Sequence, residues 1–308
     1  MNKKRIVLAG GSGFIGSVLA RECHAKYGEV IVLTRAPRKR NDGVIEAEWT
    51  GSQLGEWIQY LDGADAVVNL TGKNINCRHT PENVRALMES RVNSVRALAL
   101  AMEHVKVPPR VWVQAGGVGF YGNSGERICD ENSPNGSDNL ANICRQWESA
   151  FNTAPTPKTR KVLLRIGVAL GGGSALPVLA TLTKWFLGGS AGNGKQFVSW
   201  ISIRDLMRIF GESIAREDLS GTFNAVAPNP VRNEEFMREL RRALHRPWSP
   251  PAPVWAVKIG AWLMKTDPSL ALDSCRVVPK RLAEAGFQFQ FPELGMALGD
   301  IFGSKIAI

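Results

Sequence analysis

The chain of 308 residues lacks the cysteine and histidine spacing that disulfide frameworks and zinc sites require. Its five cysteines are odd in number, lie far apart and include no C-x-x-C pair. The four histidines are equally scattered, and no pair has metal-ligand spacing. These absences argue against a disulfide-stapled secreted module and against a metal site. We therefore expect reduced thiols and no metal.

Long apolar runs are also missing. The N-terminus passes from three basic residues straight into a strand, without the apolar core and cleavage site of a signal peptide. The apolar stretch 254–264 is too short to span a bilayer and contains Lys258. We therefore expect a cytoplasmic protein with no membrane partner.

The charge is unbalanced, with 38 Lys and Arg against 28 Asp and Glu, a formal net charge of +10. Such a surplus can attract nucleic acid, an anionic membrane or a phosphorylated ligand, and it also serves solubility. No nucleic-acid-binding motif and no basic stripe interleaved with aromatic residues accompanies it, so we expect no nucleic acid partner. The densest basic cluster, 35–40, has a more specific interpretation.

Glycine, by contrast, forms a cluster just after the first apolar run. A short apolar run, 5–9, breaks into glycines at every third position, and an apolar-periodic helix follows at once. In a dinucleotide-binding βαβ unit, the first glycine turns tightly, the second lets backbone N–H groups approach a pyrophosphate, and the third lets helix pack on strand. The strand before and the helix after make the signal more specific. The predicted cofactor contacts here are Gly10, Gly13, Phe14, Ile15 and Gly16.

The end of the next predicted strand, 29–34, bears on which dinucleotide binds. An NAD site has Asp or Glu there, about twenty residues beyond the glycines, to bond the ribose 2′-hydroxyl. This chain has Thr34 and Arg35, with Arg38 to Arg40 behind them. A carboxylate repels a 2′-phosphate, whereas a guanidinium binds it bidentately. We interpret Arg35 as an NADP(H) contact and Arg38 to Arg40 as a solvated basic loop.

Strands and helices alternate through residue 170. Further apolar runs of strand length occupy 65–70, 110–115 and 162–168, with helical patterns at 80–102 and 140–148 between them. Thr80 is a good N-cap for the first of these helices, and Gly28 a plausible stop for the helix that follows the glycines. The alternation predicts an α/β fold with a Rossmann-type doubly wound parallel sheet.

Composition changes after the glycines at 171–173, because the remainder is richer in Trp and Pro. We assign 1–170 to an NADP-binding Rossmann domain and 171–308 to a smaller mixed α/β substrate lobe. A strand near 221–226 is expected to return to the first domain. A helix over 233–244 is expected to begin with Asn233 as its N-cap.

Ten segments carry a family resemblance that runs over essentially the whole chain: 10–16, 69–72, 90–94, 118–122, 130–134, 144–148, 164–171, 199–201, 224–230 and 277–282. The sequence resembles the extended short-chain dehydrogenase/reductase superfamily, and within it the atypical epimerase family related to nucleoside-diphosphate-sugar epimerases. The resemblance implies a small-molecule substrate, with a nucleotide sugar as one candidate, and a family-specific C-terminal segment. It also implies NADP(H) contacts at Thr34, Arg35, Leu70, Thr71, Gly72 and Arg91.

Arg91 interrupts the apolar stripe of the helix over 80–102. From the residues alone it has two interpretations: its side chain snorkels to the surface, or it faces the cofactor crevice. Trp147 and Trp200 have a similar pair of interpretations, as ligand-stacking rings or, more commonly, as core residues.

The catalytic residues that the superfamily uses are absent. Its chemistry relies on a Ser or Thr and on a Tyr-x-x-x-Lys pair, and the matching positions here are Gly116, Leu140 and Cys144. With no known charged partner, Cys144 is expected to be a packed thiol. Tyr121 is the nearest phenol to the expected nicotinamide, although its counterpart is more often structural. The catalytic residue is therefore unknown, with Tyr121 as the remaining candidate.

Two functions follow from this pattern. The first is an NADP(H)-dependent oxidoreductase or epimerase with nonstandard proton transfer, since proximity to the cofactor alone accelerates a reaction. The second is a non-catalytic NADP(H)-binding regulatory protein. A homodimer is a further expectation, because helix-pair dimers are common in the superfamily, although the helix surfaces do not settle it.

Overall fold

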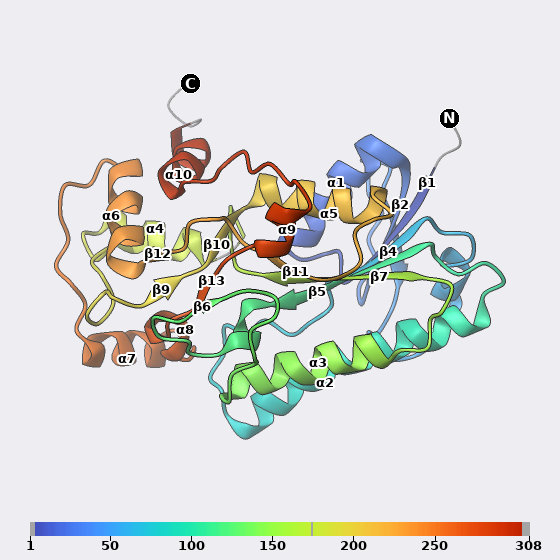
Figure 1. Ribbon diagram of the computed structural model, residues 1–308, viewed down its shortest axis with the longest axis horizontal. Helices are drawn as coiled ribbons and strands as arrows, with labels where there is room; N and C mark the ends of the chain where they lie inside the picture. Colours follow the sequence, from blue (N-terminus) through green and yellow to red (C-terminus); the bar gives the residue numbers. More distant parts are fainter. Residues whose placement is uncertain (1–3, 174, 304–308) are drawn as a thin grey trace.

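Seven parallel strands form the largest sheet of the computed structural model, which describes residues 4–173 and 175–303 (Figure 1). In sheet order they are β3 (Ile45–Glu48), β2 (Gly28–Thr34), β1 (Lys4–Ala9), β4 (Ala66–Asn69), β5 (Val111–Gly117), β7 (Arg160–Ile166) and β11 (Gly221–Ala225). From β1 the chain builds outward in one direction, then crosses back and builds outward in the other. The predicted doubly wound parallel sheet is thereby confirmed.

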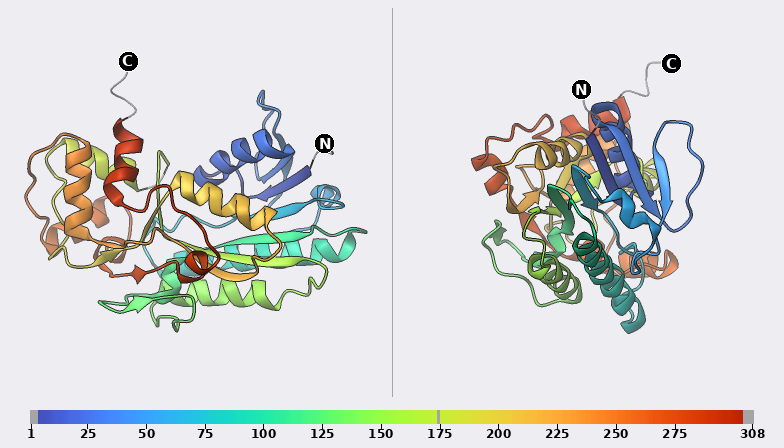
Figure 2. Two further views of the ribbon diagram at one scale, coloured as in Figure 1. Left: turned by 45° about the horizontal axis from the view of Figure 1, so that its top comes forward. Right: turned by 90° about the vertical axis from the view of Figure 1, so that its right-hand side faces the viewer.

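Helices cover both faces of this sheet (Figure 2). α1 (Phe14–Tyr27) and α5 (Ile203–Ala215) pack on one face, and α2 (Pro81–His104) and α3 (Asn139–Thr153) pack on the other. Two separate apolar cores result, one on each side of the strands. The central strands read as continuous apolar runs because both of their faces are buried.

The local signals act at the helix ends as expected. Gly28 follows α1 with a φ of +92°, a conformation that glycine adopts at little steric cost. Thr80 caps α2, since its side-chain oxygen accepts a hydrogen bond from the Asn83 amide. Asp138 caps α3 in the same way through the Ala141 amide.

The remaining elements lie mostly beyond the carboxyl ends of the large sheet (Figure 1). Three pairs of short strands form there: β8 (Val168–Leu170) with β10 (Trp200–Ser202), β9 (Phe197–Val198) with β12 (Val231–Arg232), and β6 (Ile128–Cys129) with β13 (Arg276–Val277). The accompanying helices are α4 (Leu176–Lys184), α6 (Asn233–Ala243), α7 (Val254–Leu263), α8 (Ser269–Leu272), α9 (Lys280–Glu284) and α10 (Leu294–Gly303). Two 3-10 turns, η1 (Glu56–Tyr60) and η2 (Val118–Tyr121), complete the chain.

A third apolar core, centred on Trp200 and Phe236, holds α6 and α10 together. Trp200 and Trp147 are both buried, as core residues are. β11 pairs with β7, so the chain re-enters the large sheet where the sequence places its returning strand. The domain boundary at residue 170 stays a prediction.

The expected cap of α6 is wrong by one residue. The N-cap position is Arg232, and Asn233 is the first residue of the helix. The Asn233 side chain serves a different segment, because its Oδ1 accepts a hydrogen bond from the Ala191 amide at 2.8 Å. A long-range contact has taken the side chain that local propensity assigns to the helix end.

Three further findings concern the described residues alone. Their cysteines are all free. Within 4–173 and 175–303, no group of three or more His, Cys, Asp or Glu is placed to hold a metal ion. Over the same ranges, every helix is too short or too polar to cross a membrane.

The cap of α3 provides a test of this fold. Asp138 accepts hydrogen bonds from the Ala141 amide at 2.9 Å and from the Asn123 amide at 3.1 Å. Asp138→Ala should lower the free energy of unfolding by about 1–2 kcal/mol, because it leaves the Ala141 amide of the helix and the Asn123 amide of the loop unpaired. Asp138→Asn keeps a capping oxygen and should cost much less. Urea unfolding followed by circular dichroism measures both, and equal losses would contradict the capping role.

Candidate cofactor-binding and active site

β1 and β4 are the neighbouring strands at which the strand order of the large sheet reverses. After β1 the chain enters α1 on one face, and after β4 a loop over 70–80 leads to α2 on the opposite face (Figure 1). Ligands of open α/β sheets bind in the crevice formed at this point. Two backbone hydrogen bonds fix its floor, from Gly10 N to Leu33 O at 3.0 Å and from Leu70 N to Ala9 O at 2.8 Å.

The glycines in the loop after β1 have different spatial constraints. Gly10 has a φ of +73°, and a Cβ atom there would lie 2.8 Å from the Thr71 Cα. A Cβ at Gly16 would lie 2.5 Å from the Gly11 Cα, so this glycine lets the helix approach the loop. A Cβ at Gly13 would meet nothing within 4 Å. Gly13 therefore borders open space, where a ligand phosphate can approach the backbone.

The N-terminus of α1 points its free amides at that space. Gly13 is the N-cap and provides no side-chain hydrogen bond, and the first turn contains no acidic residue. The first hydrogen bond of the helix runs from Ser17 N to Gly13 O, so the amides of Phe14, Ile15 and Gly16 precede it. Free amides and the positive end of the helix dipole suit an anion.

Thr34 and Arg35 lie at the end of β2, beside the glycine loop. Thr34 is 9% exposed, and its hydroxyl lies 3.4 Å from the Ser12 hydroxyl. Arg35 is exposed, and its guanidinium forms no ion pair or hydrogen bond with any residue that the structure describes. Arg40, by contrast, pairs with Asp42 and Glu46. The guanidinium nearest the strand end is thus available for a phosphate.

A buried amide at the end of β4 holds the opposite wall of the crevice. Asn69 is fully buried, and its Nδ2 donates to the Ser94 Oγ at 3.1 Å and to the Gln114 Oε1 at 3.0 Å. Its Oδ1 accepts from the Thr71 amide at 3.0 Å. Asn69 therefore ties β4 to α2, to β5 and to the following loop. The sequence marked this segment as a family match and gave no sign of this bonding role.

Thr71 and Gly72 continue this wall. The Thr71 hydroxyl is buried without a hydrogen-bond partner, which is uncommon for a buried polar atom. A Cβ at Gly72 would lie 3.1 Å from the Arg91 Cζ, so a side chain there would press on that guanidinium. The unpaired Thr71 hydroxyl of the loop and the Arg91 guanidinium of α2 therefore lie at the same wall of the crevice.

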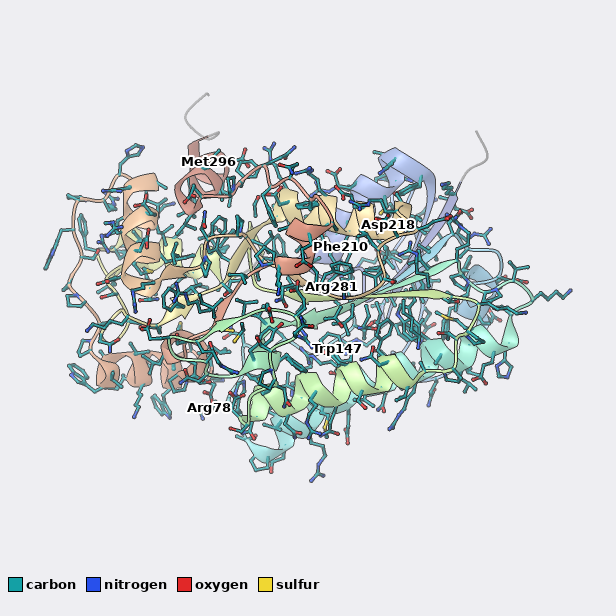
Figure 3. All side chains as sticks on the ribbon, in the orientation of Figure 1. Arg78, Trp147, Phe210, Asp218, Arg281 and Met296 are labelled. Carbon is teal, nitrogen blue, oxygen red and sulfur yellow. The ribbon has the colours of Figure 1, made fainter. Side chains whose placement is uncertain are left out.

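Arg91 is buried, so its side chain does not snorkel to the surface, and its contact with the cofactor stays a prediction. It is 9% exposed, its Nη1 donates to the Leu87 carbonyl at 2.9 Å, and its Cζ lies 5.1 Å from the centre of the Trp147 ring. Figure 3 labels Trp147 on α3, above α2 in that view. Burial lowers the pKa of Arg91. No carboxylate pairs with it among the residues that the structure describes, so its remaining donors suit a ligand.

A second glycine segment reaches the same place from the far part of the chain. A Cβ at Gly171 would lie 2.5 Å from the Phe14 Cζ, and one at Gly173 would lie 2.6 Å from the Phe14 Cβ. The loop after β8 therefore packs against the first residue of α1. The sequence showed the glycines at 171–173 only as a change of composition.

The end of β5 lacks side chains where the superfamily places its hydroxyl. A Cβ at Gly116 would lie 3.4 Å from Leu163 and Leu164 atoms, within the sheet. A Cβ at Gly117 would lie 3.9 Å from the Cys144 Sγ. Cys144 itself is buried, and burial raises the pKa of its thiol to about 12. A neutral thiol is a poor proton acceptor at neutral pH.

Tyr121, the remaining phenol near this end, belongs to a buried polar network. It is fully buried, its hydroxyl donates to the Asn224 Oδ1 at 2.7 Å and accepts from the Arg165 Nη1 at 2.8 Å. Burial raises the pKa of Tyr121 to about 12. With its hydroxyl doubly bonded inside the protein, the geometry favours a structural role.

Arg165 is neutralised by Glu148 in the same network. Its Nε and Nη2 donate to the two carboxylate oxygens at 2.9 and 2.8 Å, and both residues are 5% exposed. The Arg165 guanidinium also lies 3.5 Å from the centre of the Phe120 ring. Strand β7, helix α3, turn η2 and strand β11 are thereby joined. The sequence showed these residues only within family-matching segments, because nothing local reveals such pairing.

The parallel sheet and the crevice at the carboxyl ends of β1 and β4 define the class of this protein. It is a Rossmann-type α/β protein with a dinucleotide-binding crevice. A family model described as "NAD dependent epimerase/dehydratase family" matches residues 6–143, and one described as a domain of unknown function (DUF1731) matches 252–301. The chain is 34% identical to the epimerase family protein SDR39U1 homolog, chloroplastic, of Arabidopsis thaliana, over 95% of this chain and 85% of that protein. The chain belongs to this epimerase family.

Solved structures agree with the fold. The crystal structure of human epimerase family protein SDR39U1 (isoform 2) with NADPH is similar with a TM-score of 0.86 and 33% identity, over 97% of this chain and 99% of that one. That of the nucleoside-diphosphate sugar epimerase from Corynebacterium glutamicum has a TM-score of 0.79 and 32% identity, over 98% of this chain and 59% of that one.

The buried ion pair beside the crevice can be tested by stability. Glu148→Ala should lower the free energy of unfolding by about 3–5 kcal/mol, because it leaves the Arg165 charge buried and unpaired. The double variant Glu148→Leu with Arg165→Met removes both charges and should recover most of that loss. Chemical unfolding of the three proteins measures the difference.

An exposed ion pair supplies the control. Glu217 is 86% exposed at its side chain and lies 3.7 Å from Arg110, so Glu217→Ala should change stability by less than about 1 kcal/mol. A Glu148→Ala loss as small as this would show that the buried pair is not desolvated.

Proposed function

We propose that this protein is an NADP(H)-dependent oxidoreductase or epimerase whose proton transfer does not use a Ser/Tyr/Lys group. NADP(H) binding is the established part of this function, because the NADPH complex of the human relative and the geometry of the crevice both support it. The observation that supports catalysis is the pair of glycines, Gly116 and Gly117, at the end of β5, because neither adds a side chain where the reactive end of a dinucleotide would lie.

Different residues of the crevice would bind different parts of the cofactor. The amides of Phe14, Ile15 and Gly16, approached past Gly13, would hold the pyrophosphate. Arg35 would pair with the 2′-phosphate, next to Thr34. When bound, the cofactor supplies hydride transfer.

The opposite wall would hold the rest of the cofactor. Leu70, Thr71 and Gly72 would line it, and the unpaired Thr71 hydroxyl would gain a partner. Gly10 belongs to the same site, because its lack of a side chain admits Thr71. Beyond these residues, Arg91 would face the nicotinamide end.

Arg91 also supplies the charge that the missing lysine would have carried. Its guanidinium is buried and pairs with no described carboxylate, and its charge is felt at Cys144. A fixed cation in a poorly solvated site stabilises negative charge that develops on a substrate oxygen. In this proposal the proton itself comes from solvent or from the substrate, since Leu140 has no titratable group and the Cys144 and Tyr121 protons are held tightly.

The substrate that we propose is a small molecule, with a nucleotide sugar as the first candidate because the Corynebacterium relative is described as a nucleoside-diphosphate sugar epimerase. We keep the cytoplasm as the proposed compartment, since the free cysteines suit reducing surroundings, although the Arabidopsis relative is chloroplastic. We also propose that the protein does not bind nucleic acid.

A homodimer through α2 and α3 is also proposed. These helices lie side by side on the outer face of the sheet (Figure 1). A hollow of about 470 Å³ between them is lined by residues that include Arg96, Leu100, Arg145 and Ala150. The hollow is far from the strand ends, so it suits an interface better than a substrate.

The second candidate function is non-catalytic NADP(H) binding in a regulatory protein. One observation favours it: the two hydroxyl and thiol groups nearest the end of β5, those of Tyr121 and Cys144, have pKa values near 12 and serve packing. A protein that keeps its cofactor crevice and loses its acid has this arrangement.

Cofactor preference tests the role of Arg35. Arg35→Ala should weaken NADPH binding by roughly 10–100-fold and NADH binding little, because one charged hydrogen-bonding group contributes about 1.5–3 kcal/mol. Arg38→Ala removes an exposed cation from the same loop and should change neither affinity much. Titration of cofactor fluorescence measures these constants. Equal affinity of the parent protein for NADPH and NADH would refute the assignment.

Turnover separates the two candidate functions. Incubation with NADPH and a panel of nucleotide sugars, ketones and quinones should give cofactor oxidation or an epimer if the protein is an enzyme. Absorbance at the NADPH band and chromatography of the sugars provide the two readouts. Where turnover is found, Arg91→Met should lower kcat on the order of 100-fold, as loss of a stabilising donor does. If no substrate of the panel is turned over and NADPH still binds, the result would favour the regulatory protein.

A further inference from the structure

Helix α7 exposes an unusually apolar face. Its largest side chains are exposed, with values of 67% for Trp255, 52% for Ile259, 64% for Trp262 and 66% for Leu263. These positions recur at helical spacing, and Trp255 and Trp262 lie two turns apart on one side. The opposite side packs inward through Ala261, which is 4% exposed.

The residues that the structure describes leave most of this face of α7 uncovered. α7 lies at one end of the long axis of the molecule, far from α1 (Figures 1 and 2). Soluble monomers rarely expose contiguous apolar patches of this kind unless another surface covers them. Tryptophan is the residue that favours the boundary between water and lipid.

Positive charge surrounds the same face. Residues 240–266 contain no Asp or Glu, whereas Lys258 and Lys265 lie on α7 and just after it. Arg78 comes from the loop over 70–80, donates to the Trp262 carbonyl at 3.0 Å and lies 5.7 Å from the Trp262 ring (Figure 3). The next carboxylate, Asp267, lies 3.6 Å from the His79 Nδ1.

The positive charge around α7 favours one of two surfaces that could cover it, an anionic lipid bilayer over a second copy of the chain. An isologous contact of α7 with a second copy, centred on the middle of the helix, would place the Lys258 ammonium near its own counterpart, because Lys258 would then lie close to the two-fold axis. Like charges brought together in an apolar contact are unfavourable. An anionic lipid surface instead complements Lys258, Lys265 and Arg78 while it takes up the indoles.

We propose that α7 docks this protein on an anionic lipid bilayer, with the helix lying in the headgroup region. The expectation of no membrane partner considered only a span, for which α7 is too short. A helix that lies in the interface requires an apolar face and flanking cations, not a length that crosses the bilayer.

Docking there would bring the bilayer close to the cofactor crevice. Arg78 and His79 contact the α7–α8 region, and they belong to the loop that begins at Thr71. The loop over 70–80 therefore connects the lipid-facing helix with the wall of the crevice.

Vesicle sedimentation tests the proposal with the full chain. The parent protein should pellet with vesicles of phosphatidylcholine and phosphatidylglycerol, should not pellet with phosphatidylcholine alone, and should dissociate as salt is raised. Trp255→Ser with Ile259→Ser should lower partitioning about tenfold or more, because two apolar side chains no longer enter the lipid. Lys258→Gln should lower it about fivefold.

Controls keep the result interpretable. Val107 is 58% exposed in the connection between α2 and β5, at the opposite end of the sheet, so Val107→Ser should bind vesicles like the parent. All variants should keep the parental circular dichroism and NADPH affinity. The proposal is overturned if the parent binds neither vesicle, or if the α7 variants bind as tightly as the parent. It is equally overturned if sedimentation velocity shows a dimer that the α7 variants abolish.

Discussion

The close approach of the loop after β1 to the loop after β4 is the constraint on which the rest of the crevice depends. The Thr71 backbone occupies the space that a side chain at position 10 would need, so Gly10 fits there. Asn69 holds Thr71 in place, because its Oδ1 accepts a hydrogen bond from the Thr71 backbone amide. Helix α1 can start only where this contact leaves room, so its free amides point into the same opening. The cofactor crevice therefore results from how closely two strand ends pack, before any side chain contacts a ligand.

Two buried arginines show how the protein separates stability from binding. Arg165 is matched by the Glu148 carboxylate and the Tyr121 hydroxyl, which makes it a rigid link under the crevice. Arg91 is buried to a similar degree, with a ring, a carbonyl and no carboxylate among its described neighbours. Desolvation of an unmatched cation is unfavourable, and an anionic or polar ligand relieves it. This is why Arg91, and not Arg165, is the arginine assigned to the ligand in the proposed site.

Local signals in the sequence predicted the parts of this protein that are locally determined. The glycine loop, Gly28 and Thr80 act through the backbone within one turn, so their residue types identify them. The remaining features depend on distant partners: Asn233 bonds Ala191, Glu148 pairs with Arg165, and the glycines at 171–173 accommodate Phe14. Strands β6 and β13 have two residues each and pair across about half the chain. They are too short for an apolar periodicity to reveal them in the sequence.

The same distinction explains why α7 is easy to misread from the sequence. Alternation of apolar and small residues over 254–264 is typical of a buried helix, and the apolar length alone cannot say which face is covered. Only the packing of Ala261 against the protein shows that the indoles face outward. An inward-facing version of this helix would need acidic or neutral neighbours for Lys258, and 240–266 offers no acid. Burial, charge and aromatic content therefore agree on a surface that is completed from outside the chain.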